Sequence, residues 1–257
     1  MITSTTNQQV KHVQKLQKSS KYRSEMGLFV VEGWRMLQEI PEDFVEKIYL
    51  LESESSGLTN IGLDKVTTVS DQVLKAMSRE VSPQGIIGIA KMKPVDYELT
   101  SGENPLIVAL DCVQDPGNLG TIIRTAEAAG VDQVILSKGT VDLYNPKVVK
   151  STMGAIYRMS IMKDVDLVDY LQAMKKKNIA VYAAHLEGEI DHFHFNYTQG
   201  TCFVMGNEGN GLSDVVAKQT SDYLKIPMQP EAESLNVAMA TGILIYEAVR
   251  QRKSLNK

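Results

Sequence analysis

The chain has 257 residues, of which 43% are hydrophobic and 23% are charged, and its formal net charge is -4 at pH 7. This balance indicates a soluble globular protein and excludes the disordered and fibrous classes. Because the net charge is negative, we expect no general affinity for polyanions, although a local basic patch is compatible with it. The length allows one large domain or two small ones.

Two further features bear on where the protein acts. No apolar run approaches the length of a membrane span, and the first residues lack the apolar core of a signal peptide. Cys112 and Cys202 lie far apart in apolar strand-like runs, without the spacing of a zinc site or a redox dithiol. We therefore expect a cytoplasmic protein with no membrane attachment and with two buried free thiols.

The first 24 residues hold five basic side chains and no acidic one. Lys11, Lys15 and Lys18 have the i, i+4, i+7 spacing that places them on one face of a helix. A solvated helix face explains this run. Because an acidic chain concentrates its first cations here, the segment also fits docking on a phosphate backbone. The candidate contacts are Lys11, Lys15, Lys18 and Arg23.

The first 95 residues alternate strand-like and helical patterns, which predicts a small α/β domain. Leu28 to Val31 predicts a strand that turns at Glu32 and Gly33 into a helix, and ranges 46–53, 65–70 and 85–92 predict further strands. Range 70–80 predicts a helix with Ser70 as its N-cap. Range 93–105 has two prolines and no periodicity, so we expect a linker there.

The second half, from residue 104 to 257, alternates strands and helices throughout. Pro105 to Val113 is a continuous apolar run, as in parallel strands that are covered on both faces. The pattern predicts a mainly parallel α/β sheet with helices on both sides. The last helix, from about Leu235 to Arg250, is apolar or small nearly all round before Glu247, which predicts burial in a core or a subunit interface.

The segment DPGNLGTIIR carries the first candidate chemistry. Asn118 stands at a helix start, where its side chain can cap the backbone or meet a ligand. Arg124 points away from the apolar stripe of that helix. It can be an ordinary surface arginine paired with Glu127, or a guanidinium held at the carboxyl edge of the sheet, where α/β folds place ligands.

Two later turns form the second candidate region. Met205 to Ser213 has three glycines and two asparagines around Glu208, and its spacing is neither a dinucleotide fingerprint nor a P-loop. Ser234 and Asn236 open the last helix; capping explains one of them, whereas both together indicate a functional turn. Because each turn follows a short strand-like run, we expect the two to frame a pocket for a flat polar ligand.

The histidines predict no metal site. His192 and His194 are close in sequence, but no further Cys or His cluster accompanies them. His185 ends a predicted strand at the presumed ligand edge and can line the pocket. The sequence contains no recognisable Ser/His/Asp or Cys/His arrangement.

Three segments, NLGTIIRTA, FVMGNEGNGLS and IPMQPEAESLNVAMA, resemble the ordered motifs of the SpoU (TrmH) family of RNA ribose methyltransferases, in the SPOUT superfamily. The match covers residues of about 105 to 250. The basic start and FVVEGWR are similar to the ribosomal-protein-like substrate-binding domain often fused to these enzymes. The resemblance implies an RNA-binding domain at 1–95 and, at 104–257, a methyltransferase domain whose C-terminal segment is threaded into a trefoil knot.

The resemblance also implies a cofactor and a set of site residues. S-adenosylmethionine would be held in a bent shape, largely by backbone groups, and the ribose 2′-hydroxyl of an RNA would attack its methyl group. By motif position the cofactor contacts are Gly206, Ile226 and Leu235, with Met205, Met228 and Ala238 nearby. The implied catalytic set is Asn118, Arg124, Glu208, Ser234 and Asn236.

Several alternatives stay open at this point. The family proposal makes Arg124 the base, but a guanidinium keeps its proton, so we favour alkoxide and phosphate stabilisation by Arg124 and leave the proton acceptor open. The family implies a homodimer in which Arg124 can act across the interface, and a structured ribosomal or transfer RNA as substrate. The competing function is a non-catalytic RNA-binding or ribosome-assembly factor; a nicotinamide or nucleotide enzyme comes third.

Overall fold

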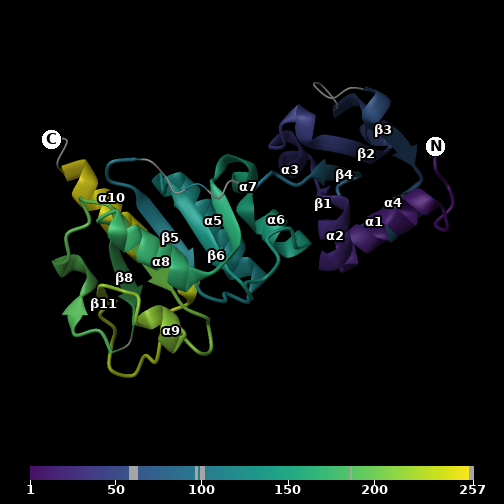
Figure 1. Cartoon of the computed structure of the whole chain (residues 1–257). Helices are drawn as coiled ribbons and strands as arrows, with labels where there is room; N and C mark the ends of the chain where they lie inside the picture. Colours follow the sequence, from purple (N-terminus) through teal and green to yellow (C-terminus); the bar gives the residue numbers. More distant parts are fainter. Residues whose placement is uncertain (58–62, 96–97, 99–101, 186, 255–257) are drawn as a thin grey trace. The chain divides into compact units, whose positions relative to one another are not determined.

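The computed structural model describes residues 1–57, 63–95, 98, 102–185 and 187–254, and it divides into two compact units (Figure 1). The first unit comprises Met1–Pro94 and Asp142–Tyr157, and the second comprises Val95–Val141 and Arg158–Lys257. The expected linker, 93–105, includes residues 96–97 and 99–101, which lie outside the described part of the chain.

The first unit contains a four-stranded sheet in the order β1-β4-β2-β3. Strand β4 is antiparallel to β1 and β2, whereas β2 and β3 are parallel. The strands are β1 (Leu28–Glu32), β2 (Val45–Leu51), β3 (Val66–Val69) and β4 (Ile86–Lys91). Each strand predicted from the sequence is therefore confirmed, with ends that shift by one to two residues.

Short helices surround this sheet. They are α1 (Gln8–Lys18), α2 (Ser20–Met26), α3 (Trp34–Gln38), α4 (Asp71–Met77), α6 (Pro146–Thr152) and α7 (Ala155–Arg158), with 3-10 turns η1 (Glu42–Phe44), η2 (Glu52–Gly57) and η3 (Leu63–Lys65). The predicted cap of α4 is confirmed, because the Ser70 hydroxyl accepts a hydrogen bond from the Val73 N–H at 3.4 Å. The helical pattern at 145–159 is split in two at Met153, whose φ is 49°.

Helix α1 has the two faces that its sequence predicts. Val10 and Val13 are fully buried against the sheet, whereas Lys11, Lys15 and Lys18 are exposed. The helix begins at the side chain of Asn7, which accepts from the Gln9 N–H at 2.8 Å. The lysine face is thus presented to solvent by the burial of the opposite face.

The inclusion of Arg23 in this basic face is wrong. Its side chain is only 4% exposed, and its Nη1 donates to the carbonyl of Leu16 at 2.6 Å. Its Nε donates to the carboxylate of Asp142 at 2.9 Å. The chain breaks at Ser19, which caps α2, and this second helix turns Arg23 inward. Counting basic residues along the sequence could not detect that turn.

The second unit contains a seven-stranded sheet in the order β7-β6-β5-β10-β8-β11-β9. All neighbouring pairs in it are parallel, so the expected parallel α/β sheet is confirmed. The strands are β5 (Leu106–Leu110), β6 (Gln133–Ser137), β7 (Ile161–Val165), β8 (Ala180–Ala184), β9 (Ile190–Asp191), β10 (Thr201–Met205) and β11 (Asp222–Lys225). Sequence reading missed β7 because it is an edge strand with polar Lys163 and Asp164 within it.

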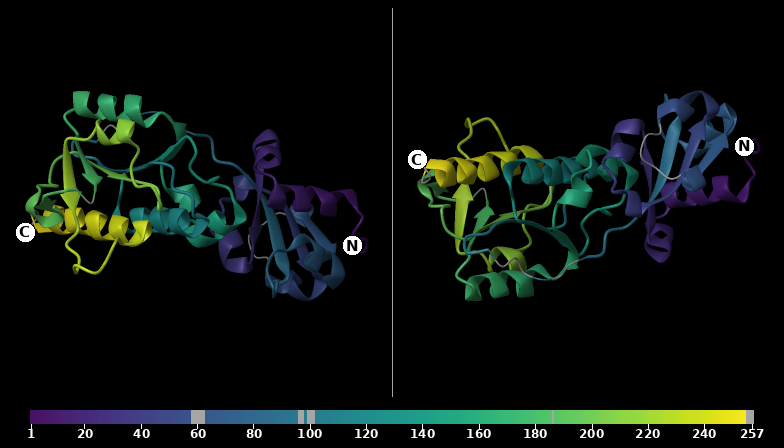
Figure 2. Two further views of the ribbon diagram at one scale, coloured as in Figure 1. Left: turned by 90° about the horizontal axis from the view of Figure 1, so that it is seen from below. Right: turned by 90° about the horizontal axis from the view of Figure 1, so that it is seen from above.

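Helices cover both faces of this sheet (Figures 1 and 2). Helices α8 (Leu167–Lys176) and α9 (Asp214–Ala217) lie on one face, and α5 (Pro116–Ala129) and α10 (Val237–Ser254) lie together on the other. The central strands are buried along their whole length, as the apolar run in β5 predicts. Cys202 in β10 is fully buried, which raises the pKa of its thiol to about 12, whereas Cys112 is only half-buried.

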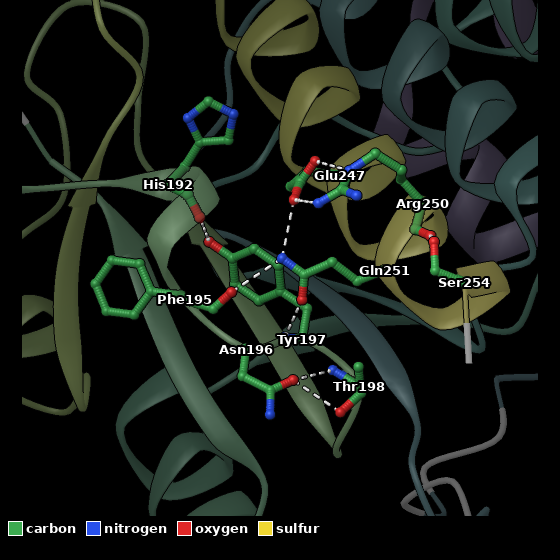
Figure 3. Close-up of polar contacts among 9 residues, drawn as sticks. All are labelled: His192, Phe195, Asn196, Tyr197, Thr198, Glu247, Arg250, Gln251 and Ser254. Carbon is green, nitrogen blue, oxygen red and sulfur yellow. Dashed lines mark hydrogen bonds and ion pairs between the residues drawn. The ribbon is translucent and has the colours of Figure 1, made fainter.

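The C-terminal half of α10 is fastened to the segment before β10, in which η4 (His192–His194) is the short helical turn (Figure 3). Gln251 accepts from the Tyr197 N–H at 2.8 Å and donates to the carbonyl of Phe195 at 2.9 Å. The buried Tyr197 hydroxyl donates to the carbonyl of His192 at 2.5 Å. These bonds hold α10 in place along the sheet.

Within the described ranges, no helix combines the length and apolarity that crossing a bilayer requires.

Replacing Arg23 by alanine should destabilise the first unit. The change leaves Asp142 without its cation and removes the donor to the Leu16 carbonyl, so we expect the free energy of unfolding to fall by roughly 2–4 kcal/mol. Trp34, the single tryptophan, lies in this unit, so its fluorescence in a urea titration follows the transition. As a control, Lys21→Ala at an 87% exposed side chain should change stability by less than about 0.5 kcal/mol. Equal effects of the two changes would contradict the structural role of Arg23.

Candidate active site

The three sequence motifs meet at one edge of the seven-stranded sheet. Strands β5, β10 and β11 end at Leu110, Met205 and Lys225, and they run parallel. Because parallel strands present their carboxyl ends at the same edge, the segments 111–118, 206–213 and 226–236 all leave the sheet there. Such an edge is the usual ligand site of an α/β fold.

The loop 206–213 folds back tightly on itself. Asn207 and Gly211 exchange backbone hydrogen bonds of 2.9 and 3.0 Å, and Gly211 has a φ of 68°. A Cβ atom on Gly206 would lie 2.3 Å from the carbonyl carbon of Gly211, so only glycine fits there. The Asn207 amide oxygen accepts from the Gly209 N–H at 2.9 Å, which closes the turn.

The carboxylate of Glu208 joins this loop to the start of α5. It accepts hydrogen bonds of 3.0 Å from the backbone N–H groups of Gln114 and Asp115 and from the side-chain amide of Asn118. Partial burial raises the pKa of Glu208, but the bonds from Asn118 and from backbone N–H groups outweigh this, so the pKa lies below its ordinary value of 4.5. Glu208 is therefore an ionised acceptor that positions the loop.

Asn118 extends the same network to α10. Its amide oxygen accepts from the Asn236 amide at 2.9 Å, while the Asn236 oxygen accepts from the Ala238 N–H at 2.9 Å and caps the helix. Asn236 thus caps α10 and bridges to the second motif at once. The structure brings together Asn118, Glu208 and Asn236, which come from three separate segments.

Asp111 is a residue of this edge that sequence reasoning missed. It is 5% exposed, and its carboxylate accepts from both the N–H and the hydroxyl of Ser213, at 3.0 and 2.8 Å. Asn207 adds a bond of 2.7 Å to the carbonyl of Cys112. The beginning, middle and end of the loop 206–213 are therefore tied to segment 111–118. A carboxylate within the apolar run PLIVALDCV was the available signal.

Arg124 and Ser234 stand apart from this network. Both are exposed, and within the described residues neither makes a side-chain hydrogen bond or ion pair. The alternative pairing of Arg124 with Glu127 is not formed, because Glu127 binds Arg158, whose Nη2 donates to it at 3.2 Å. Arg124 lies six residues beyond Asn118, about 9 Å along the axis of α5.

The six residues proposed for a cofactor lie on the same edge but differ in exposure. Met205 and Ala238 are buried, whereas Gly206, Ile226 and Met228 are half-buried and Leu235 is 39% exposed. Residues 226–236 form neither helix nor strand, so their backbone groups can serve a ligand. A surface of glycine, short loops and backbone groups fits a cofactor that is held mainly through the main chain.

The histidines take structural places in this unit. His185 follows β8 at the same edge and stacks on Tyr223, with ring centroids 4.7 Å apart. His192 and His194 lie in η4 and form no cluster with other ligating groups. In the part of the chain that the structure describes, no group of three or more His, Cys, Asp or Glu side chains is arranged for a metal ion.

The low pKa of Glu208 predicts a pH-dependent contribution to stability. A folded-state pKa below the ordinary 4.5 stabilises the fold above that pH, and the contribution is lost as the pH falls through the folded-state value. In Glu208→Gln an amide N–H group would face the backbone donors. We expect the difference in thermal midpoint between the two proteins to be largest near about pH 7 and to shrink below about pH 4.5. A difference that is constant with pH would rule out an ionised Glu208.

Comparisons with known proteins identify the family of the chain. The sequence model described as the SpoU rRNA Methylase family matches residues 105–246, and the MRM3-like substrate binding domain matches residues 7–88. The 23S rRNA (guanosine(2553)-2′-O)-methyltransferase RlmP of Bacillus subtilis is 32% identical over 251 residues, which cover 95% of this chain and 97% of that protein.

Several solved structures cover nearly the whole chain, and two of these are AdoMet complexes. An AdoMet-bound rRNA methyltransferase from Sinorhizobium meliloti superposes with a TM-score of 0.85 at 31% identity, covering 97% of both chains. The SpoU methyltransferase AviRb from Streptomyces viridochromogenes, in complex with AdoMet, superposes with a TM-score of 0.86 at 26% identity, covering 96% of this chain and 99% of that one. The resemblance of the three motifs is thereby confirmed. The chain belongs to the SpoU rRNA methylase family and is an S-adenosylmethionine-dependent RNA 2′-O-methyltransferase.

Proposed function

We propose that the protein methylates a ribose 2′-hydroxyl in ribosomal RNA of the large subunit, and that it does so as a homodimer. The observation that carries this proposal is the network of Asn118, Glu208 and Asn236, which holds all three family motifs at one edge of the sheet. Several relatives, among them one that covers 95% of this chain, are named 23S rRNA methyltransferases, which favours ribosomal over transfer RNA. With ribosomal RNA as the substrate, the expected place of action is the cytoplasm.

Methyl transfer needs an aligned acceptor more than a strong base. S-adenosylmethionine supplies a methyl group on a positively charged sulfur, which is already electrophilic. The amide of Asn118 is held at both ends, by Glu208 and Asn236, so its remaining N–H points in a fixed direction at the site. Arg124 stabilises the developing alkoxide and holds the adjacent phosphate, because a guanidinium keeps its charge. The exposed Ser234 hydroxyl completes the polar set.

Glu208 acts as a positioning residue in this proposal. Its two oxygens already accept three hydrogen bonds, and its lowered pKa makes it a weak proton acceptor. The cofactor is assigned to the backbone of Gly206, Ile226 and Leu235, with Met205, Met228 and Ala238 lining the site. Family membership supports this assignment, as it supports a trefoil knot in the segment that returns through α10.

The N-terminal part is proposed to bind the RNA. The exposed lysines of α1, Lys11, Lys15 and Lys18, present charge to a phosphate backbone. The division into an RNA-binding domain at 1–95 and a methyltransferase domain at 104–257 is supported by the two family matches. Segment 142–157 belongs to the second of these domains by sequence but packs in the first unit.

Changing Arg124 to alanine should remove methyl transfer and spare the cofactor. We expect kcat to fall by at least about 10²-fold, because charge stabilisation in the transition state is lost. S-adenosylmethionine affinity, measured by calorimetry, should stay the same, since Arg124 makes no side-chain hydrogen bond or ion pair with residues 206–213 or 226–236. Lys177→Ala, which removes another exposed cation, at the C-cap of α8, serves as the control. If the Arg124→Ala variant keeps the wild-type kcat, the role assigned to Arg124 in methyl transfer is wrong.

The homodimer is supported by an apolar stripe on α10. Its inner face is buried in the chain, but Met239, Ile243 and Tyr246 are 61%, 39% and 51% exposed, and Leu235 precedes them. The spacing of Met239, Ile243 and Tyr246 places these three on one face of the helix, and Leu235 lies in the segment just before it. Within one chain, α10 is thus not buried all round as expected. A second copy of the chain is proposed to bury the exposed apolar stripe.

Arg124 belongs to the same surface. Helix α5 packs beside α10. A Cβ atom placed on Gly242 of α10 would lie 3.8 Å from Cγ2 of Thr125 in α5. The outer side of α5 exposes Thr121, Arg124 and Ala128. A dimer closed over α10 would therefore bring Arg124 close to the partner's site, which explains why Arg124 joins no network among the described residues of its own chain.

A charge placed in the stripe should break the dimer and the activity together. We expect Ile243→Asp to sediment as a folded monomer, because a carboxylate cannot be buried unpaired in an apolar interface. Methyl transfer should fall by at least about tenfold if Arg124 acts across the interface. Val215→Asp, at a 60% exposed valine on α9, is the matched control and should remain dimeric. A wild-type protein that sediments as an active monomer would refute the shared site.

The alternative function is RNA binding without turnover. Incubation with labelled S-adenosylmethionine and total RNA separates the two. Label that maps to ribose 2′-oxygens supports the enzyme, whereas binding without transfer supports the assembly factor.

A further inference from the structure

A cavity of about 290 Å³ opens in the first unit, and none of its lining residues belongs to the active site. Its wall is formed by Val30 and Val31 of β1, Met36 of α3 and Val149 of α6. Each of these side chains is at most 7% exposed. The wall is therefore firmly packed and apolar, and α6 supplies one side of it.

The two carboxylates at this cavity are already satisfied. Glu32 accepts from the Gln17 amide at 2.6 Å and from the Arg79 N–H at 3.0 Å. Glu80 binds the ammonium group of Lys150 through both oxygens, at 2.7 Å each. Lys150 neutralises Glu80, whereas among the described residues Glu32 accepts only from neutral donors and keeps its negative charge at the cavity.

Two cations at the cavity have no such partner. Arg79 and Lys147 are exposed, and in the described chain neither side chain makes a hydrogen bond or an ion pair. They stand beside the apolar wall, Arg79 after α4 and Lys147 at the second residue of α6. The cavity thus combines an apolar surface with a free guanidinium and a free ammonium group, which is the chemistry that binds a planar ring carrying a phosphate.

We propose that this cavity binds a single nucleotide of the substrate RNA, separate from the nucleotide that is methylated. The base lies against Val31, Met36 and Val149, and Arg79 and Lys147 hold its phosphate. The volume lies just below the usual range for ligand pockets, about 300–1,000 Å³, so it accommodates no more than one unstacked nucleotide and no duplex. The inference rests on the proposed function, because RNA is the polyanion that the enzyme must hold.

The test removes both free cations in the full-length protein. Arg79→Ala/Lys147→Ala is assayed with in vitro transcribed large-subunit ribosomal RNA at several salt concentrations. We expect KM for RNA to rise about tenfold and the slope of log affinity against log salt to lose about one unit, as for a lost phosphate contact. The value of kcat at saturating RNA and the affinity for S-adenosylmethionine should not change.

Two further variants keep the outcome specific. Lys176→Ala/Lys177→Ala removes two exposed charges elsewhere and should leave KM and the salt slope unchanged. Arg79→Lys/Lys147→Arg keeps both charges and should retain most of the RNA affinity. An unchanged KM and salt slope in the double alanine variant, or an equal loss in the Lys176/Lys177 control, overturns the proposed pocket. If the wild-type protein transfers no methyl group to any RNA, the proposed function fails, and direct RNA binding by the same variants still tests the pocket.

Discussion

The hydrogen bonds that the Glu208 carboxylate accepts hold together the edge of the sheet at which the three motifs meet. This carboxylate accepts from residues 90 to 94 positions earlier in the chain and so joins two loops that share no local structure. Hydrogen bonds to an ionised acceptor contribute more than neutral ones, about 1.5–3 kcal/mol each where they are shielded from water, and less at this exposed position. Their main effect is to hold the loop 206–213 in one conformation.

Glu208 does not act alone in holding this loop. Asp111 binds Ser213 at the end of the loop, and Asn207 binds the Cys112 carbonyl at its beginning. The close approach of Gly206 to Gly211 makes the turn compact enough for these bonds to form together. A loop rich in glycine loses much conformational entropy when it becomes ordered. The hydrogen bonds made by Glu208, Asp111 and Asn207 offset that cost. The result is a backbone surface that the chain's own hydrogen bonds organise, as the methyl transfer site proposed at this edge requires.

The family match and the physical structure divide the chain differently. Segment 142–157 lies inside the region matched by the methylase family, yet it is joined to the N-terminal part of the chain by the ion pairs Arg23–Asp142 and Glu80–Lys150 and by the ring contact of Phe29 with Tyr144. The Phe29 and Tyr144 rings lie 4.7 Å apart, so this contact is part of a core. One consequence is that α6 completes the wall of the cavity in the first unit. The first unit of the enzyme is thus built from two stretches of sequence.

The sequence by itself determined the local features: the parallel strands from continuous apolar runs, the start of α4 from Ser70, the tight turn from its glycines, and the family from three ordered motifs. These succeed because apolar periodicity, caps and turns depend on neighbours a few residues away. It also pointed to Asn118, Glu208 and Asn236, although their roles in catalysis stay predictions. Only the tertiary structure decided that Arg23 turns inward to Asp142, that Glu127 pairs with Arg158, that Asp111 holds Ser213, and that one face of α10 stays bare. Each of these features depends on groups far apart in the chain. A local sequence pattern does not determine which distant residue a side chain contacts in the folded protein.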